Sequence, residues 1–209
     1  MSSPRSLDVL VEIESLAPLG DAVGRQRGGE HDGRVTFVPF AAPGEMVWAR
    51  VERTKSTVAW ATLRNVDAPS AARVTSPCPL FGTCGGCQWQ HVDRPTQLHA
   101  KRDIVSRALR RPGEPAVATA ASPDFGYRQR AKLFVDRAPS GATVVGYRGR
   151  RSHSVLDVEA CPLLTARANR ALAIARPHLR ALPVGAEVRL QEGREGVAFV
   201  APRFVAMVD

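Results

Sequence analysis

Three cysteines close together in the sequence constrain the fold more than any other feature of this chain. Cys78, Cys84 and Cys87 follow the spacing Cys-x5-Cys-x2-Cys in the segment CPLFGTCGGC, and 73 residues lie between Cys87 and the fourth cysteine, Cys161. Glycines beside them allow the segment to wrap tightly, so that the sulfurs converge on one centre and stay open to backbone N–H donors. The start of the chain contains no apolar signal core, and cytosolic thiols stay reduced. We therefore expect the cysteines to bind a metal or a cluster rather than to form disulfides.

Four thiolates suit either a [4Fe–4S] cluster or a zinc ion. Zinc sites usually combine two short Cys or Cys/His pairs, whereas three clustered cysteines with one distant partner favour the cluster. Zinc and unliganded buried thiols stay open as alternatives. His91, four residues after Cys87, is a further zinc candidate, but we interpret it as a hydrogen-bonded loop residue.

Basic residues outnumber acidic ones, with 29 Lys and Arg against 20 Asp and Glu, a net charge of +9 and a pI near 10.4. This charge favours a polyanionic partner, because Lys and Arg release counterions from phosphate backbones when they bind. Arginine supplies 26 of the 29, which suits bidentate phosphate contacts and stacking on bases. Nucleic acid is therefore the first candidate partner, and a solvated basic surface is the alternative.

The composition, with 44% hydrophobic and 23% charged residues, is typical of a globular protein that buries a core. No run approaches the roughly 18 apolar residues that span a bilayer. We expect a cytoplasmic monomer without a membrane partner.

The hydrophobic pattern predicts a mixed β and α+β fold. Residues 1–66 are interpreted as a small OB-like β-barrel, because short alternating segments are separated by turn residues. Its strands are expected over 7–14, 34–40, 45–53 and 57–66. Residues 67–77 lack periodicity and are interpreted as a linker.

Residues 78–209 are predicted to hold the cysteine loop and an incomplete α+β domain. Its expected elements are a helix over 93–111, a hairpin of 130–136 and 142–148, a helix over 163–176, and a final strand, turn and strand. Asp93 is the expected cap of the first helix, with apolar residues Leu98, Val105 and Leu109 at helical spacing. Pro177 is expected to kink or stop the second helix.

Basic residues are concentrated between 126 and 153, and we interpret this region as an RNA contact surface. The candidate contacts are Arg128, Arg130, Lys132, Arg148, Arg150, Arg151 and His153. Arg128, Arg130 and Lys132 alternate along one expected strand and so project from one face. Tyr127, Tyr147 and His153 are available to stack on bases. The alternative is a solvated face with core tyrosines.

The expected barrel is nearly neutral, with seven basic and eight acidic residues over 7–66. An RNA surface there requires segregated charge, and the candidates are Arg25, Arg27, Arg34, Arg50 and Arg53. The aromatic residues of this region are interpreted as core rather than stacking surfaces: Phe37, Phe40, Trp48 and Trp60.

These motifs together resemble a family, the bacterial RNA uracil-5-methyltransferases that carry an N-terminal TRAM domain and a [4Fe–4S] cluster. GDAVGR and FVPFAAPGEMV resemble the TRAM barrel, an oligonucleotide-binding module. CPLFGTCGGCQWQHV followed by QLHAKRDIV resembles the cluster loop and its helix, and DFGYRQRAKLFV and VGYRGRRSHSVLDVEACPLL resemble the central domain. The resemblance implies that Cys78, Cys84, Cys87 and Cys161 are the cluster ligands.

The family's reaction implies attack of a cysteine thiolate on uridine C6 and methyl transfer from S-adenosylmethionine to C5 of an rRNA or tRNA base. In the family these groups belong to a C-terminal Rossmann-like domain. This sequence offers no glycine-rich strand–loop–helix for the cofactor and no spare cysteine, so we assign no catalytic residue and no S-adenosylmethionine contact here. A zinc- or cluster-bearing RNA-binding protein without catalysis, and a redox protein, are the alternative functions.

Overall fold

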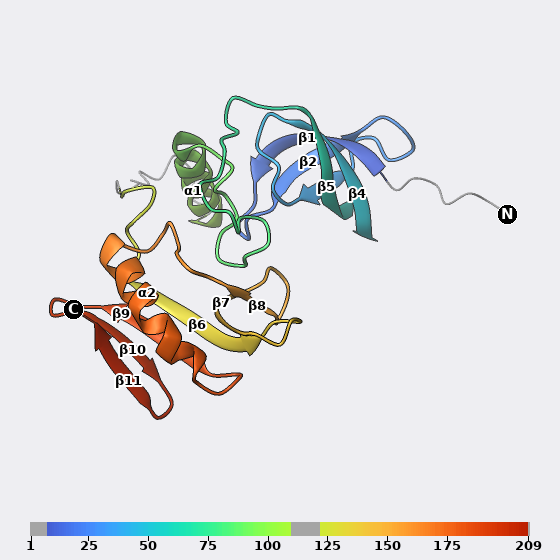
Figure 1. The fold of residues 1–209 in the computed structure, drawn as a ribbon. Helices are drawn as coiled ribbons and strands as arrows, with labels where there is room; N and C mark the ends of the chain where they lie inside the picture. The colour runs from blue at the N-terminus through green and yellow to red at the C-terminus, as the bar shows by residue number, and fades with distance from the viewer. Residues whose placement is uncertain (1–7, 110–121, 209) are drawn as a thin grey trace. The chain divides into compact units, whose positions relative to one another are not determined.

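A computed structural model describes residues 8–109 and 122–208, which form two compact units. Each unit combines two stretches of the chain (Figure 1). Among the described residues, the first unit contains 8–76 and 88–109, and the second contains 77–87 and 122–208. The domain boundaries expected from the sequence, at residues 66 and 77, stay a prediction.

The first unit contains a closed five-stranded barrel with the strand order β1-β2-β3-β5-β4. The strands are β1 (Asp8–Leu16), β2 (Ala22–Arg27), β3 (Val35–Val38), β4 (Met46–Lys55) and β5 (Val58–Ala68). All neighbours are antiparallel except β3 and β5, which run parallel and close the ring. The expected small barrel and the mixed fold class are confirmed.

The interior of the barrel holds small side chains, because five strands enclose little space. Fully buried members include Val11, Val47, Ala49 and Ala59. The strands also approach closely at Gly24, where an added Cβ would lie 2.0 Å from the carbonyl oxygen of Glu12. No aromatic side chain therefore fits at that point.

A buried ion pair fixes the chain that leaves the barrel. The carboxylate of Glu45, which is fully buried, accepts hydrogen bonds from the Ala42 N–H at 2.8 Å and from the Arg73 guanidinium. Arg73 also donates to the Phe40 carbonyl at 2.9 Å. Burial of a carboxylate requires such pairing, because the unpaired charge loses its hydration.

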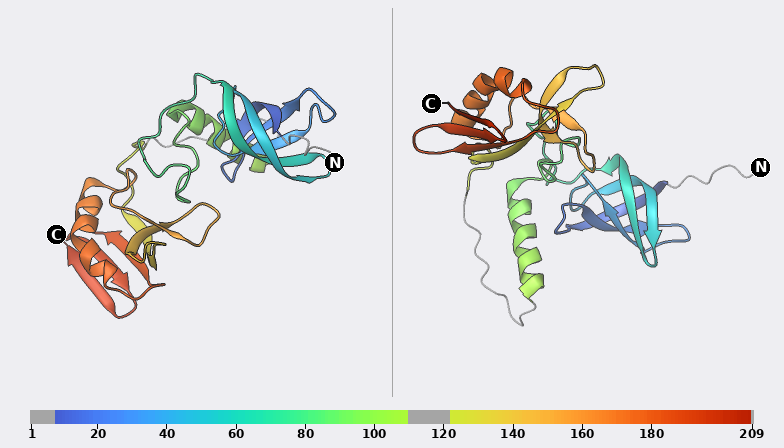
Figure 2. Two further views of the ribbon diagram at one scale, coloured as in Figure 1. Left: turned by 45° about the vertical axis from the view of Figure 1, so that its right-hand side comes forward. Right: turned by 90° about the horizontal axis from the view of Figure 1, so that it is seen from below.

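Helix α1 (Arg94–Leu109) belongs to the same unit and lies beside the barrel in the views of Figure 2. The Asp93 side chain caps it by accepting from the Thr96 N–H at 3.0 Å, as expected. The predicted apolar stripe is not buried, since Val105 and Leu109 are 43% and 50% exposed. Residues 110–111, which the sequence assigned to this helix, lie outside the described residues.

The second unit is a six-stranded antiparallel sheet in the order β11-β10-β9-β6-β7-β8, with one helix across one face (Figures 1 and 2). The strands are β6 (Arg130–Arg137), β7 (Thr143–Arg148), β8 (Val155–Asp157), β9 (Glu187–Glu192), β10 (Val197–Ala201) and β11 (Phe204–Val208). The predicted hairpin of β6 and β7 is confirmed. Large side chains fill its core, including Leu133, Leu190 and Phe199, all at most 1% exposed.

Helix α2 (Ala166–Arg180) packs its apolar side, with Leu172 and Leu179, on this sheet. Thr165 begins the helix, because its hydroxyl accepts from the Ala168 N–H at 3.0 Å. The helix continues for three residues beyond Pro177, so the predicted end at 176 is wrong, whereas the alternative of a kink at this proline stays a prediction.

The sequence also missed β2 and β8, and it predicted two strands where β9, β10 and β11 form three. β2 was missed because its glycine and three polar residues conceal a short alternation of buried and exposed positions. β8 has three residues, too few for a period to be read.

Candidate metal centre and nucleic-acid interface

The loop that carries three cysteines is held against the end of β7. The Gly85 N–H donates to the Arg148 carbonyl at 3.0 Å, and the Arg150 N–H donates to the Thr83 carbonyl at 2.7 Å. An added Cβ at Gly85 would lie 3.1 Å from the carbonyl oxygen of Arg148, so a side chain at this position would disturb these two hydrogen bonds. The glycine of the loop therefore allows two segments that are distant in the sequence to pair.

Cys161 is positioned by the first turns of α2. Its N–H donates to the side-chain oxygen of Asn169 at 2.9 Å, and its carbonyl accepts from the Asn169 side-chain nitrogen at 3.0 Å. A single amide side chain thus fixes both backbone groups of this cysteine. Asn169 has no signal of its own in the sequence, and the sequence-based reasoning missed it.

The four cysteines belong to the same unit, each is half-buried, and all are thiols. Burial raises the pKa of the Cys84 thiol, the Gly86 N–H at 3.4 Å from its sulfur opposes that rise, and negative charge on Cys78 and Cys161 adds to it. Cys84, Cys78 and Cys161 are therefore electrostatic neighbours.

That these thiols influence one another electrostatically does not mean that they are arranged as metal ligands. Within residues 8–109 and 122–208, no three His, Cys, Asp or Glu side chains lie together as metal ligands do. His91 is buried in the first unit, where its Nε2 lies 3.0 Å from the Ala41 carbonyl. Burial lowers the pKa of His91, so the neutral ring is favoured. This agrees with a hydrogen-bonded loop residue.

Tyr147 and Arg128 also lie near the cysteines. The Tyr147 hydroxyl is buried, and its pKa is raised by burial and by the neighbouring Cys161. Arg128 precedes β6, is half-buried, and pairs with Leu164 as an isolated bridge. Its charge opposes the rise in the pKa of Cys84. Arg128 therefore lies at the cysteine site, outside β6. The sequence analysis had placed it on that strand, in one row with Arg130 and Lys132.

Arg130 and Lys132 are exposed on β6 and project from the face of the sheet opposite α2. On β9, Arg189 is the registered partner of Lys132 and Gln191 that of Arg130. Glu187 forms ion pairs with Lys132 at 2.9 Å and with Arg189 at 3.4 Å. The alternation of EVRLQE carries the signal that identifies Arg189, which the sequence-based reasoning missed.

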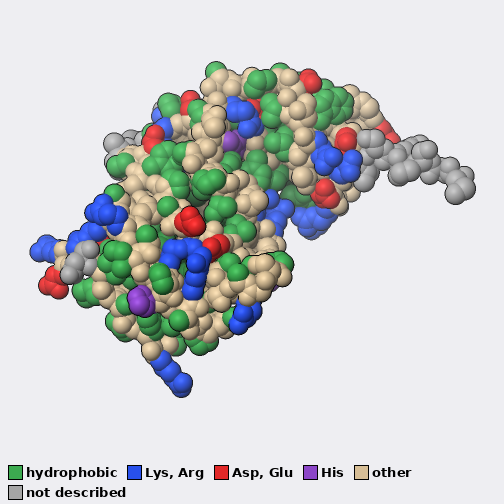
Figure 3. Space-filling model, viewed as in Figure 1, with side chains coloured by type: hydrophobic (Ala, Val, Ile, Leu, Met, Phe, Trp, Pro, Cys, Tyr) green, Lys and Arg blue, Asp and Glu red, His purple; other side chains and the backbone are tan. Residues whose placement is uncertain are grey.

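The remaining candidates lie on and after β7. The guanidinium carbon of Arg148 is 4.3 Å from the centroid of the Phe134 ring. Arg151 and His153 are exposed and Arg150 is half-buried in the connection from β7 to β8. Of the two tyrosines, Tyr127 is 45% exposed. Figure 3 shows Lys and Arg side chains scattered over the surface in that view. The basic row on β6 and β9 is therefore defined by the register of the two strands.

The interpretation of the barrel aromatics as core was wrong for Trp48, which is 41% exposed. Phe37 and Trp60 are half-buried on the outer surface. The physical reason is the narrow interior, which Val and Ala side chains already fill. Three candidate arginines of the barrel pair with carboxylates, at 3.2 Å or less: Arg25 with Glu14, Arg27 with Glu12, and Arg50 with Asp8.

Comparison with known proteins identifies a TRAM domain over residues 5–63. An RNA methyltransferase of Gloeobacter violaceus is 37% identical over 82% of this chain and 38% of its own length. The 23S rRNA (uracil(1939)-C(5))-methyltransferase RlmD of Ralstonia nicotianae is 40% identical over 74% of this chain and 36% of its own length. The chain thus spans little more than a third of these relatives.

The crystal structure of Pyrococcus abyssi tRNA (uracil-54, C5)-methyltransferase in complex with S-adenosyl-L-homocysteine has a similar fold, with a TM-score of 0.63. The match covers 95% of this chain and 46% of that one, at 24% sequence identity. Among the described residues, no helix is long and apolar enough to cross a membrane.

Proposed function

We propose that this chain is the RNA-binding, cluster-carrying portion of a TRAM-domain RNA uracil-C5-methyltransferase. The observation that carries the proposal is the identity of 37% over 82% of the chain to the Gloeobacter violaceus relative and of 40% over 74% to the Ralstonia nicotianae relative, taken with the basic face of β6 and β9. The substrate is rRNA or tRNA.

In this proposal the chain's own residues hold RNA and do no methyl transfer. Arg130, Lys132 and Arg189 attract the phosphate backbone, and the exposed Arg151 and His153 extend the contact. S-adenosylmethionine and the thiolate that attacks uridine belong to a catalytic domain outside this chain. This division is supported by the length of the relatives, of which the chain spans little more than a third.

We infer that a [4Fe–4S] cluster is bound by Cys78, Cys84, Cys87 and Cys161. The chemistry of the donor set suits a cluster, because four thiols share one unit and Gly86 presents its N–H to the Cys84 sulfur. The described side chains do not stand at the mutual spacing of bound ligands, so the proposal rests on donor type and shared unit. Such a cluster supplies a covalent tie between the loop and Cys161 and a capacity for one-electron exchange. Asn169 holds Cys161 in place for binding.

The experiment is metal analysis of the anaerobically purified chain. We expect about four iron atoms per chain and a brown colour, with loss of both in Cys161→Ser. Asn169→Ala, which keeps every thiol, is expected to lower the iron content less. Stoichiometric zinc, or a full cluster in Cys161→Ser, would contradict the ligand assignment. RNA binding by the same preparations is measured in parallel.

A further inference from the structure

Four neighbouring strands of the barrel align one row of side chains on its outer surface. Their register places Val23 of β2, Phe37 of β3, Trp60 of β5 and Arg53 of β4 next to one another. The Phe37 and Trp60 rings are stacked, with centroids 5.8 Å apart and an interplanar angle of 11°. The guanidinium carbon of Arg53 lies 3.9 Å from the centroid of the Trp60 ring. The row is a continuous stack of three flat groups.

The next row along the same strands has a similar character. Arg25, Val35, Val58 and Lys55 are registered partners across β2, β3, β5 and β4. Val35 and Val58 are half-buried, whereas Arg25 and Lys55 are exposed. The two rows together form an apolar strip with basic side chains at its ends.

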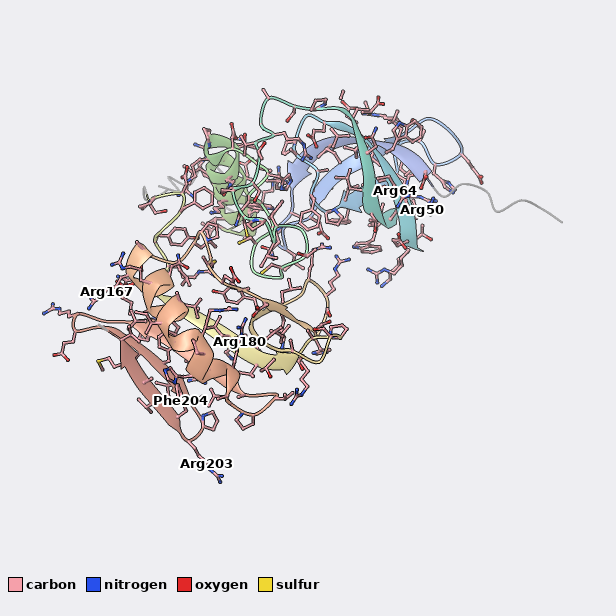
Figure 4. All side chains as sticks on the ribbon, viewed as in Figure 1. Arg50, Arg64, Arg167, Arg180, Arg203 and Phe204 are labelled. Atoms are coloured by element: carbon pink, nitrogen blue, oxygen red, sulfur yellow. The ribbon has the colours of Figure 1, made fainter. Side chains whose placement is uncertain are left out.

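Arg53 differs from three other arginines of the barrel in what it contacts. Arg25, Arg27 and Arg50 each pair with a carboxylate. Figure 4 shows Arg50 and Arg64 on the neighbouring strands β4 and β5. The pKa of Asp8 is lowered by the hydrogen bond from Arg50 and by the charge of both arginines. Arg53 instead lies over an aromatic ring and, within the part of the chain that the structure describes, forms no ion pair with a carboxylate.

We propose that the stack of Phe37, Trp60 and Arg53 is a binding site for a single-stranded nucleic acid, in which one base stacks on the exposed guanidinium of Arg53. The site rests on the proposed function, since it deepens the RNA contact by naming an unpaired strand as its ligand. Planar guanidinium and aromatic groups stack on any base, and the exposed Lys55 offers charge to the flanking phosphates. A duplex hides its base faces and does not fit this strip.

The test uses the full chain, a fluorescently labelled single-stranded oligouridylate of about ten nucleotides, and the substitution Arg53→Lys. Lysine keeps the charge but removes the planar group, so we expect the Kd to rise about five- to tenfold with an unchanged dependence on salt. Quenching of tryptophan fluorescence by the oligonucleotide is expected to fall as well. The matched control is Arg50→Lys on the same strand, which is expected to bind like the parent chain.

Each other outcome separates the site from the proposed function. Parent-like binding by Arg53→Lys, or equal weakening by Arg53→Lys and Arg50→Lys, would overturn the stacking site while RNA binding by the chain stands. Tighter binding of a duplex than of the oligouridylate would also overturn it. A parent chain that binds no RNA at all would overturn the proposed function and this site with it.

Discussion

The barrel buries its apolar surface inside a closed ring of five strands, whereas the second unit buries its own between an open sheet and one helix. The barrel core consists mainly of Val and Ala with Ile13 and Leu16, and the Phe37 and Trp60 rings stack outside it. The helix-covered sheet has room for Phe199 and several leucines. The narrow interior of the barrel excludes large side chains, so they lie on its outer surface, where a ligand can contact them. The stack of Phe37 and Trp60 is the example in this molecule.

Both units also fix a connecting segment with an ion pair. In the first unit Glu45 is fully buried and depends on Arg73. In the second unit the buried residue is Arg176 of α2, which donates to Asp157 at 2.9 Å and also bonds the Val145 and Val158 carbonyls. Loss of Arg73 would leave the Glu45 carboxylate buried without an opposite charge. Loss of Asp157 would leave the Arg176 guanidinium with its hydrogen bonds to the Val145 and Val158 carbonyls.

The chain offers a separate optical signal for each unit. All three tryptophans, Trp48, Trp60 and Trp89, belong to the first unit, and both tyrosines, Tyr127 and Tyr147, belong to the second. Tryptophan fluorescence therefore follows unfolding of the first unit, and the tyrosine signal in near-ultraviolet circular dichroism follows the second. The comparison is testable unit by unit.

The largest expected effect is the loss of the ring at Phe199. Phe199→Ala is expected to lower the free energy of unfolding of the second unit by about 4 kcal/mol, because it leaves a cavity between the sheet and α2. Urea unfolding followed by the tyrosine signal measures this loss. The tryptophan transition is the internal control, and an equal shift of both transitions would contradict the separate cores.

Arg73→Ala is expected to cost the first unit about 3 kcal/mol, because the Glu45 carboxylate stays buried without its partner. Tryptophan fluorescence in urea measures the change. The double variant with Glu45→Gln, which removes the stranded charge, should recover part of the loss. If Arg73→Ala unfolds at the parent's urea concentration, the ion pair does not hold the segment.

An added side chain tests the narrow interior of the barrel. Ala49→Leu is expected to destabilise the first unit by about 2 kcal/mol, because the interior cannot expand without straining the strands. The matched change in the second unit is Ala173→Leu, at an exposed position of α2, which is expected to have little effect. A stable Ala49→Leu chain would show that the barrel has unfilled space.

The smallest expected effect depends on pH. Burial tends to raise the pKa of Asp157, but the Val145 N–H, Arg176 and Arg180 outweigh it and hold the pKa below its ordinary value of 3.8. The charged carboxylate therefore stabilises the folded unit above that pH, and the stabilisation is lost as the pH falls through the lowered pKa. Asp157→Asn is expected to cost about 1 kcal/mol at pH 7 and nothing at the acid end of the titration. A difference that persists unchanged in acid would contradict this account.

The sequence predicted the barrel, the hairpin of β6 and β7, and the two helices, because each has a clear period or a cap such as Asp93. It did not predict which rings lie inside, since the alternation of one strand does not reveal the diameter of the closed barrel. Trp48 shows this most clearly.

The candidate site was predictable to a similar degree. The spacing of Cys78, Cys84 and Cys87 identified the loop, and the chain places Cys161 in the same unit. The clamp by Asn169 and the cross-strand neighbour Arg189 depend on contacts between distant segments. Asn169 has no signal in the sequence, whereas the alternation of EVRLQE marks Arg189 as exposed, and the partners of both residues could be found only in the folded chain.

The salt dependence of RNA binding tests the central claim most directly, namely that the exposed row on β6 contacts phosphates. Arg130→Gln combined with Lys132→Gln is expected to flatten the slope of log Kd against log salt by about one to two units. The control removes the same charge elsewhere on the unit, with Arg203→Gln at the turn between β10 and β11 (Figure 4) and Arg170→Gln on α2. The account predicts a flatter slope for the first pair and the parent's slope for the second, and equal slopes for both pairs would contradict it.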